Sequence, residues 1–456
     1  MSFIIIKQLI PFLIHLPLVA YLLIQWYKYQ VDAPLKQWFW PAVCIKLLAG
    51  CGLGLLYLYY YPYQGDTWVL FEESILLNKL AFQSPLDYVR VLFLKNTAFT
   101  QHYVFLDLAI EQPRAFFMSK LISLIILFTF RNYWITGIYC SLLSFYGLWK
   151  LANQLVRYFP DTRLSACIAF FLFPSVVFWS SGVLKEFLAV VCICCIVGVV
   201  LHILYTSDSG NLKWKELLKN LRIQYICWFG ISFFVLWQIK FYYAAILLIA
   251  LLALGSTVCI CSALKTTSSR IRKSIYFLCF TGIFNLVPLI YTFLTGQSLL
   301  ESIVQNHDAT VRASSPGTFI IFSGLQPVIT SFLQHFPLAL WSGLFAPMPW
   351  QAHTGLVLSV SLENSVLLLG CIGYFLTLFW TWKKENKEPE SVLYQLIIQS
   401  IWWYSITLAV IMAFASPNFG ALTRYKIGFL PLLVYVVFSK IEKIKRQNKR
   451  STHANT

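Results

Sequence analysis

The sequence predicts an all-α membrane protein with about eleven transmembrane helices and two large extracytoplasmic loops that contain membrane-lying helices. Of the 456 residues, 59% are hydrophobic and only 12% are charged, which excludes an ordinary soluble multidomain chain. Largely apolar runs of transmembrane length recur along the whole chain. The run 187–205 is apolar except for His202, and this continuity excludes the alternating strands of an outer-membrane barrel.

Hydrophobic length and loop charge together place the helices along the chain. The expected spans are 3–26, 39–62, 134–157, 161–181, 187–206, 223–239, 242–262, 274–295, 359–381, 393–415 and 422–440. Residues 1–38 form an additional N-terminal helix with a cytoplasmic connector, 39–440 the transmembrane core, and 441–456 a basic cytoplasmic tail. The N-terminal run lacks a preceding basic region and a small-residue cleavage signal, so we expect it to be retained.

The net charge of +17 reflects membrane topology. Most of the 35 basic residues lie in short connectors and in the tail, where the positive-inside rule assigns them to the cytoplasmic face. We therefore expect the lipid bilayer, and no nucleic acid, as a partner.

Two apolar runs lie in loops that face the opposite side, 63–133 and 296–358. A crossing by 115–130 would place the basic connector 150–163 outside, so this run is expected to lie at the membrane surface. The proline-interrupted run 327–350 receives the same assignment. Long loops of this composition are more often functional than mere linkers.

Cysteines and buried cations give no indication of a metal or redox site. Most of the twelve cysteines lie within apolar runs, and none has zinc-ligand spacing with histidines, so we expect packing roles and no metal. Lys7 and Lys46 lie close enough to helix ends for us to expect that they snorkel to the interface.

The first candidate site residue is Asp66. It follows the tyrosine-rich end of a predicted span, in Gly65-Asp66-Thr67, where a new helix should begin. A carboxylate here would suit a general base. The alternative is a helix N-cap, with Glu72 and Glu73 on a solvated helix face.

The other candidates are charged residues at turns assigned to the outer side. Lys185 and Glu186 follow the Ser180-Ser181-Gly182 stretch, Lys240 lies in an aromatic turn, and Arg424 and Lys426 begin the last span. Cations in short outer loops oppose the positive-inside bias unless an anion is bound or paired. Snorkelling to lipid phosphate is the alternative for each cation.

Taken in order, these places resemble the C-type membrane glycosyltransferase (GT-C) superfamily, which includes protein mannosyltransferases, oligosaccharyltransferases and aminoarabinose transferases. The resemblance implies that Asp66 is the catalytic acidic residue at the start of the first outer loop. It also implies phosphate-binding or substrate-binding roles for Lys185, Glu186, Lys240, Arg424 and Lys426. The chain departs from the family pattern because Asp66 has no adjacent carboxylate. Lys185 leads the second acidic site, which argues against a bridging divalent metal.

The resemblance implies inverting transfer of a sugar from a polyprenyl-phosphate donor to a glycan, lipid or protein acceptor. A bacterial inner membrane with an outward-facing site would follow, and Trp341 and Trp350 would lie near the lipid or sugar. This reading requires Asp66 and the cations of the last span to converge on one cavity. The alternatives are a transporter or flippase, a polymerase or ligase of lipid-linked saccharides, and a catalytically silent scaffold.

Overall fold

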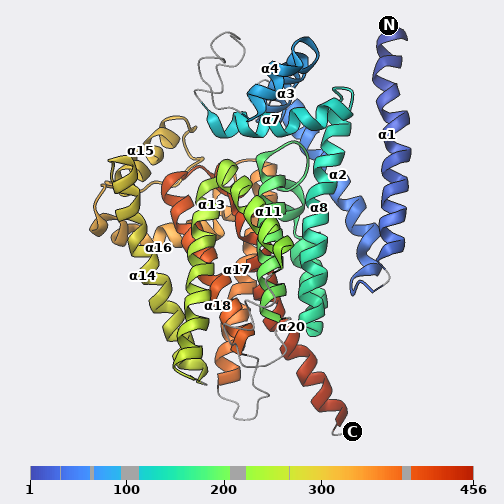
Figure 1. The fold of residues 1–456 in the computed structure, drawn as a ribbon. Coiled ribbons are helices and arrows are strands. Elements are labelled where there is room, and N and C mark those ends of the chain that lie inside the picture. The colour runs from blue at the N-terminus through green and yellow to red at the C-terminus, as the bar shows by residue number, and fades with distance from the viewer. Residues whose placement is uncertain are drawn as a thin grey trace. The chain divides into compact units, whose positions relative to one another are not determined.

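Helices account for the secondary structure of the computed structural model, which describes residues 2–30, 32–61, 66–93, 112–205, 222–266, 268–382 and 392–454 (Figure 1). Those residues form no strand; a single isolated β-bridge joins Phe319 and Asn418. The chain divides into two compact units, which are described separately. Unit 1 comprises 1–157, 170–198 and 229–241, and unit 2 comprises 158–169, 199–228 and 242–456.

Unit 1 contains the N-terminal helices and parts of two later ones. Its elements are α1 (Ser2–Tyr29), η1 (Lys36–Trp38), α2 (Phe39–Tyr59), α3 (Asp66–Gln83), α4 (Pro85–Phe93), α7 (Pro113–Phe128), α8 (Tyr133–Tyr158), α10 (Pro174–Trp179), the first part of α11 (Lys185–Tyr205) and a middle part of α13 (Ile223–Ala263). Buried aromatic rings join α2 to α8: the Phe39 ring meets the Trp149 ring edge-on, at a centroid distance of 5.1 Å.

The helix α7 turns away from α8 by 113°, and Figure 1 shows the two helices running in nearly perpendicular directions. Phe130 and Arg131 produce the turn with left-handed backbone angles, φ 51° and 58°, which are unusual for residues other than glycine. The Arg131 Nε donates to Asn78 Oδ1 at 2.7 Å, which helps to hold this conformation. The angle is what a membrane-lying α7 requires, and that placement remains a prediction.

Unit 2 contains the C-terminal helices. Its elements are η3 (Pro160–Thr162), α9 (Arg163–Cys167), the start of a π-helical turn η4 (Ile168–Leu172), the remaining parts of α11 and α13, α14 (Ser269–Thr295), α15 (Leu299–Arg312), α16 (Ile329–Phe345), η5 (Pro349–Gln351), α17 (Gly355–Trp382), α18 (Val392–Ala415), α19 (Phe419–Tyr425), η6 (Lys426–Gly428) and α20 (Leu430–Ala454). α16 and α18 approach closely at Gly343, where an added Cβ would lie 2.6 Å from the carbonyl carbon of Ala409.

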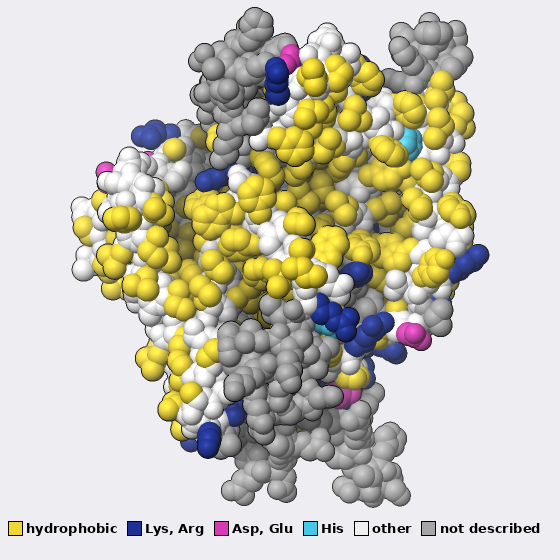
Figure 2. Space-filling model, in the orientation of Figure 1, with side chains coloured by type: hydrophobic (Ala, Val, Ile, Leu, Met, Phe, Trp, Pro, Cys, Tyr) yellow, Lys and Arg dark blue, Asp and Glu magenta, His cyan; other side chains and the backbone are white. Residues whose placement is uncertain are grey.

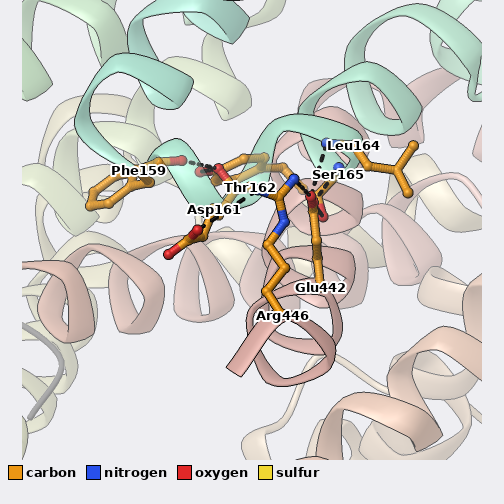
Figure 3. Close-up of polar contacts among 8 residues, drawn as sticks. Phe159, Asp161, Thr162, Leu164, Ser165, Glu442 and Arg446 are labelled. Atoms are coloured by element: carbon orange, nitrogen blue, oxygen red, sulfur yellow. Dashed lines mark hydrogen bonds and ion pairs between the residues drawn. The ribbon is translucent and has the colours of Figure 1, made fainter. Parts of the chain in front are cut away.

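A polar cluster ties α20 to the start of α9 (Figure 3). The Glu442 carboxylate accepts from the backbone N–H groups of Leu164 and Ser165, at 3.2 and 2.8 Å, and from the Ser165 hydroxyl at 2.7 Å. Arg446 donates to Glu442 at 2.7 Å and lies 3.7 Å from Asp161. Glu442 thus satisfies backbone donors that the first turn of α9 leaves open.

The helices define an all-α, multi-pass membrane protein. Among the described residues, seven helices are long and apolar enough to cross a bilayer, or eight if α7 and α8 together form one span. They are Leu9–Tyr29, Lys36–Tyr59, Lys185–Tyr205, Ile223–Ala263, Ser269–Thr295, Gly355–Trp380 and Leu393–Ala415. Figure 2 shows a broad area of hydrophobic side chains across the middle of the face drawn, as expected for a surface in contact with lipid.

The count of about eleven crossings therefore remains a prediction. α13 has 41 residues and a non-helical backbone at Lys240, where the sequence indicated a turn between two spans. The expected span 161–181 consists instead of the short elements η3, α9, η4 and α10, with a break at Phe173 before Pro174. The expected span 422–440 is divided among α19, η6 and the start of α20.

Candidate functional site

Two carboxylates share one face of α3 in unit 1. Asp66 is the first residue of the helix and is exposed, and Glu73 lies seven residues later, two turns along the same face. The Ser119 hydroxyl of α7 donates to Glu73 Oε2 at 2.8 Å. The expectation that Glu73 lies on a solvated face is wrong, because α7 packs along α3 and half-buries this side chain, whereas Glu72 is exposed.

Burial raises the pKa of Glu73 above its usual value. The Ser119 hydrogen bond and the positive charge of Lys185 oppose this rise in pKa, and the negative charge of Asp66 adds to it. The charges of Asp66 and Lys185 therefore both act on Glu73. The seven-residue spacing on a helix was the signal in the sequence that could have joined Glu73 to Asp66.

A second charged group joins the start of α11 to the break in α13. Glu186 Oε1 and Lys240 Nζ lie 3.0 Å apart, with side chains only 2% and 7% exposed. Each charge compensates the other, which a buried ion needs in order to remain charged. Lys240 is also the residue at which the α13 backbone leaves helical geometry, with φ −146° and ψ 70°.

Lys46 of α2 holds the turn that precedes these residues. Its Nζ donates to the carbonyl oxygens of Val177 and Ser180, at 3.3 and 2.8 Å, and also to the Ser180 hydroxyl. The lysine thereby caps the carboxyl end of α10, where a cation is favourable. The expectation that Lys46 snorkels is wrong: the residue is 2% exposed and directed into the unit. The Lys7 side chain lies outside the described residues.

The helix α8 fixes the same turn from another direction. The Ser144 hydroxyl donates to Ser180 O at 2.5 Å, and the Gly182 N–H donates to the Ser141 hydroxyl at 2.9 Å. Gly182 has a φ of 64°, and an added Cβ would lie 2.8 Å from Leu53 Cδ2. The chain thus reverses at a position that requires glycine, and Lys185 follows immediately at the start of α11.

Arg114 is a further cation of this region that the sequence did not single out. It is exposed near the start of α7, and its guanidinium lies 4.2 Å from the centroid of the Phe241 ring, next to Lys240. No local pattern could have revealed this contact, because it joins segments more than a hundred residues apart in sequence.

Arg424 lies in unit 2, on α19. Asn418 caps this helix by accepting from the N–H groups of Gly420 and Ala421, at 2.9 and 3.2 Å. Arg424 is half-buried, and its Nη2 donates to the Tyr425 hydroxyl at 3.4 Å. The Arg424 guanidinium lies 5.2 Å from the centroid of the Tyr425 ring, and the Tyr243 hydroxyl donates to the Tyr425 carbonyl at 2.6 Å.

Lys426 is 3% exposed and directed into unit 2. Its Nζ donates to the Ala346 carbonyl at 2.7 Å and to Asn364 Oδ1 at 3.2 Å. These bonds tie η6 to the segment after α16 and to α17. The predicted phosphate-binding role would require an anion to reach this buried amine. Trp341 and Trp350, expected near the lipid or sugar, are 41% and 72% exposed.

The predicted site residues therefore fall into two sets, one in each unit. Asp66, Lys185, Glu186 and Lys240 belong to unit 1, where Glu73 joins them, and Arg424 and Lys426 belong to unit 2. Convergence of the two sets on one cavity remains a prediction. Within the described parts of the chain, no group of three or more His, Cys, Asp or Glu residues is placed to hold a metal ion.

The fold and the charged groups define a multi-pass helical membrane protein with paired carboxylates and cations beside its apolar helices. The chain matches no protein-family model, no curated protein and no solved structure.

Proposed function

We propose that this protein is a membrane glycosyltransferase that moves a sugar from a polyprenyl-phosphate donor to an acceptor on the extracytoplasmic side. The observation that carries the proposal is the position of Asp66 and Glu73 on one face of α3, where the Ser119 hydroxyl bonds Glu73 and the charge of Lys185 acts on it. A donor with an insoluble tail and an anionic head is expected to react beside apolar helices. Carboxylates and cations are the groups that such a reaction requires.

The acid pair supplies a base for the acceptor hydroxyl. Asp66 is exposed at the start of α3 and is the first candidate. The raised pKa of Glu73 makes this carboxylate a better proton acceptor than an ordinary glutamate, so it is the second candidate. Attack by the activated hydroxyl on the sugar carbon breaks its bond to phosphate and inverts the configuration at that carbon.

The leaving phosphate is a stable anion that requires cations and no general acid. Lys185 is half-buried and its positive charge acts on Glu73, so it is the cation of unit 1 that the proposal assigns to this anion. Arg424 of unit 2, whose Nη2 donates to the Tyr425 hydroxyl, is the candidate anion contact of its own unit. Lys240 and Lys426 would contribute only after exchanging their present partners, Glu186 and Ala346.

A transporter for lipid-linked saccharides is the alternative function. It would be supported by charges arranged along a path across the bilayer. Lys46 is a buried cation in an apolar helix, but its three acceptor atoms all belong to the turn at the end of α10. This contact stabilises a single turn and supports a structural role for Lys46. It does not support a path of charges across the bilayer.

The test uses purified protein in lipid nanodiscs and a panel of radiolabelled polyprenyl-phosphate sugars with candidate acceptors. Asp66→Asn is expected to lower transfer by about 10²–10⁴-fold, the usual contribution of a general base. Glu72→Gln is the matched control, because Glu72 is an exposed acid of the same helix. Undiminished transfer by Asp66→Asn would contradict the assigned base, whereas movement of lipid-linked sugar across vesicles without transfer would identify a transporter.

A further inference from the structure

Among the described residues, the helix α14 packs against others along one narrow face. Only Tyr276 and Phe280 on this helix are buried, and they face α13 and α18. The opposite face exposes large apolar residues, including Leu278 at 66%, Leu289 at 67% and Phe293 at 89%. In a bilayer, lipid satisfies such apolar residues, so exposure alone indicates no protein partner.

Asn285 is an exposed amide on this largely apolar face. Arg270, Arg272 and Lys273 mark one end of α14, and Gly296, with φ 71°, closes the other. The apolar part between them is about 22 residues, or roughly 33 Å, and Asn285 lies close to its middle. Its side chain is exposed, and its Nδ2 donates to the Thr281 carbonyl at 2.8 Å.

That bond uses one N–H of Asn285, and among the described residues the amide oxygen and the second N–H make no hydrogen bond. Hydrocarbon offers neither a donor nor an acceptor to these atoms, and unsatisfied polar groups at this depth are costly. Interhelical bonds from asparagine are a recognised means of association between transmembrane helices. An amide is both donor and acceptor, so an identical amide on a second helix complements it.

The spacing of exposed residues around Asn285 fits a second identical helix. Ile271, Leu278, Asn285 and Thr292 recur every seven residues and are all exposed. Residues seven apart drift by only about 20° along a regular helix, so Ile271, Leu278 and Asn285 form one narrow stripe, and Thr292 continues the repeat beyond Pro288. A single asparagine within such a seven-residue repeat fixes register and helix number in coiled coils.

The same stripe permits close approach of a second backbone. Gly282 is exposed on it, and an added Cβ there would have no neighbouring atom within 4 Å. The cations at the start of the helix flank Ile271 in sequence, so they lie to either side of the stripe and do not face their counterparts directly.

We infer that α14 is a homodimer interface, in which the Asn285 amides of two copies bond across a two-fold axis along the membrane normal. The partner is a second copy of this chain, because the stripe is complementary to itself in both register and hydrogen bonding. This interface uses a surface on which the proposed sugar transfer does not depend.

Disulfide cross-linking of the full chain in native membranes tests the geometry. Leu278→Cys and Leu289→Cys lie on the stripe and are expected to form linked dimers on mild oxidation. Ile290→Cys is the matched control, since Ile290 is 54% exposed at the same depth but is rotated by about 100° from Leu289. The unmodified chain measures the background from its own cysteines. Equal linkage at Leu289→Cys and Ile290→Cys would overturn the inference.

Single-molecule photobleaching in lipid bilayers tests the amide. Asn285→Val is expected to weaken self-association by roughly threefold to thirtyfold, the range expected for one interhelical bond in a membrane. Thr281→Val is the control, because the Thr281 hydroxyl already donates to the Phe277 carbonyl at 2.8 Å. A monomeric wild-type chain, as expected if another protein's helix binds this face, would overturn the inference, as would an Asn285→Val variant that associates like wild type.

Discussion

Glu186 and Lys240 form an ion pair, 3.0 Å long and almost fully buried, between the start of α11 and the break in α13. The pair joins two residues predicted to contact substrate, and it determines the electrostatic state of this part of unit 1. Its strength can be measured without knowledge of the substrate.

Removal of one partner from this pair should destabilise the protein strongly. Glu186→Gln leaves the charge of Lys240 uncompensated, and Lys240→Met does the same to Glu186. Each change is expected to lower the free energy of unfolding by about 3–5 kcal/mol. The double variant should lose less unfolding free energy than the two single variants lose together. Thermal unfolding of the purified protein measures all three. Arg90→Gln is the control, because the Arg90 side chain is 59% exposed and its pair with Asp87 should contribute less than about 1 kcal/mol.

The raised pKa of Glu73 predicts a pH-dependent stability difference. A carboxyl whose pKa is raised in the folded state destabilises the fold when it is ionised, and this effect disappears as the pH falls below the unfolded pKa. Glu73→Gln removes the ionisation. The variant should therefore melt at a higher temperature than wild type at pH 8, and the difference should shrink towards pH 4.

Glu72→Gln is the control, because it removes a carboxylate from the exposed side of the same helix and leaves the Ser119–Glu73 contact in place. A Glu73→Gln variant whose melting temperature differs from wild type by the same amount at every pH would show that Glu73 does not titrate as described.

Lys46 should control the position of the turn that presents Lys185. Lys46→Met removes the donor shared by Val177 and Ser180, leaving buried carbonyls with fewer partners, and should increase labelling of Lys185→Cys by a water-soluble maleimide. Lys46→Arg keeps a cationic donor and should restore part of the protection. Lys79→Met replaces an exposed lysine of α3 and is the control. Unchanged labelling in Lys46→Met would show that the turn is held by Ser141 and Ser144 alone.

Gly343 should tolerate no side chain. An added Cβ would lie 2.6 Å from the Ala409 carbonyl carbon, so Gly343→Ala must separate α16 from α18 or distort one of them. Overpacking of this kind typically costs about 1–3 kcal/mol. Gly255→Ala is the control within α13, because no atom lies within 4 Å of its added Cβ. That change should be neutral or stabilising, since alanine favours helix. A Gly343→Ala variant that melts with wild type would contradict the close approach of these helices.

Hydrophobic length was sufficient to predict several of the helices. The expected spans 39–62, 187–206, 274–295 and 393–415 correspond to α2, α11, α14 and α18, because each is a long apolar run bounded by charge or aromatic residues. The run 161–181 has similar composition but breaks into short elements. Hydropathy is insensitive to the backbone change at Phe173 that Pro174 imposes.

The candidate site was only partly accessible from sequence. Asp66, Lys185 and Lys240 were conspicuous because they are charged residues at the ends of apolar runs. The burial of Glu73 depends on α7, and the role of Lys46 depends on the carboxyl end of α10. Such contacts between distant segments leave no local pattern in the chain.

The bond between Glu442 and the first turn of α9 bears on how the chain can be shortened for expression. The basic stretch at the end of α20 looks dispensable by composition. Its Glu442, however, accepts hydrogen bonds from the backbone of α9, nearly three hundred residues earlier in the chain. A truncated protein that keeps Arg446 retains these hydrogen bonds, whereas one that stops before Glu442 exposes unsatisfied amides at α9 and loosens that end of unit 2.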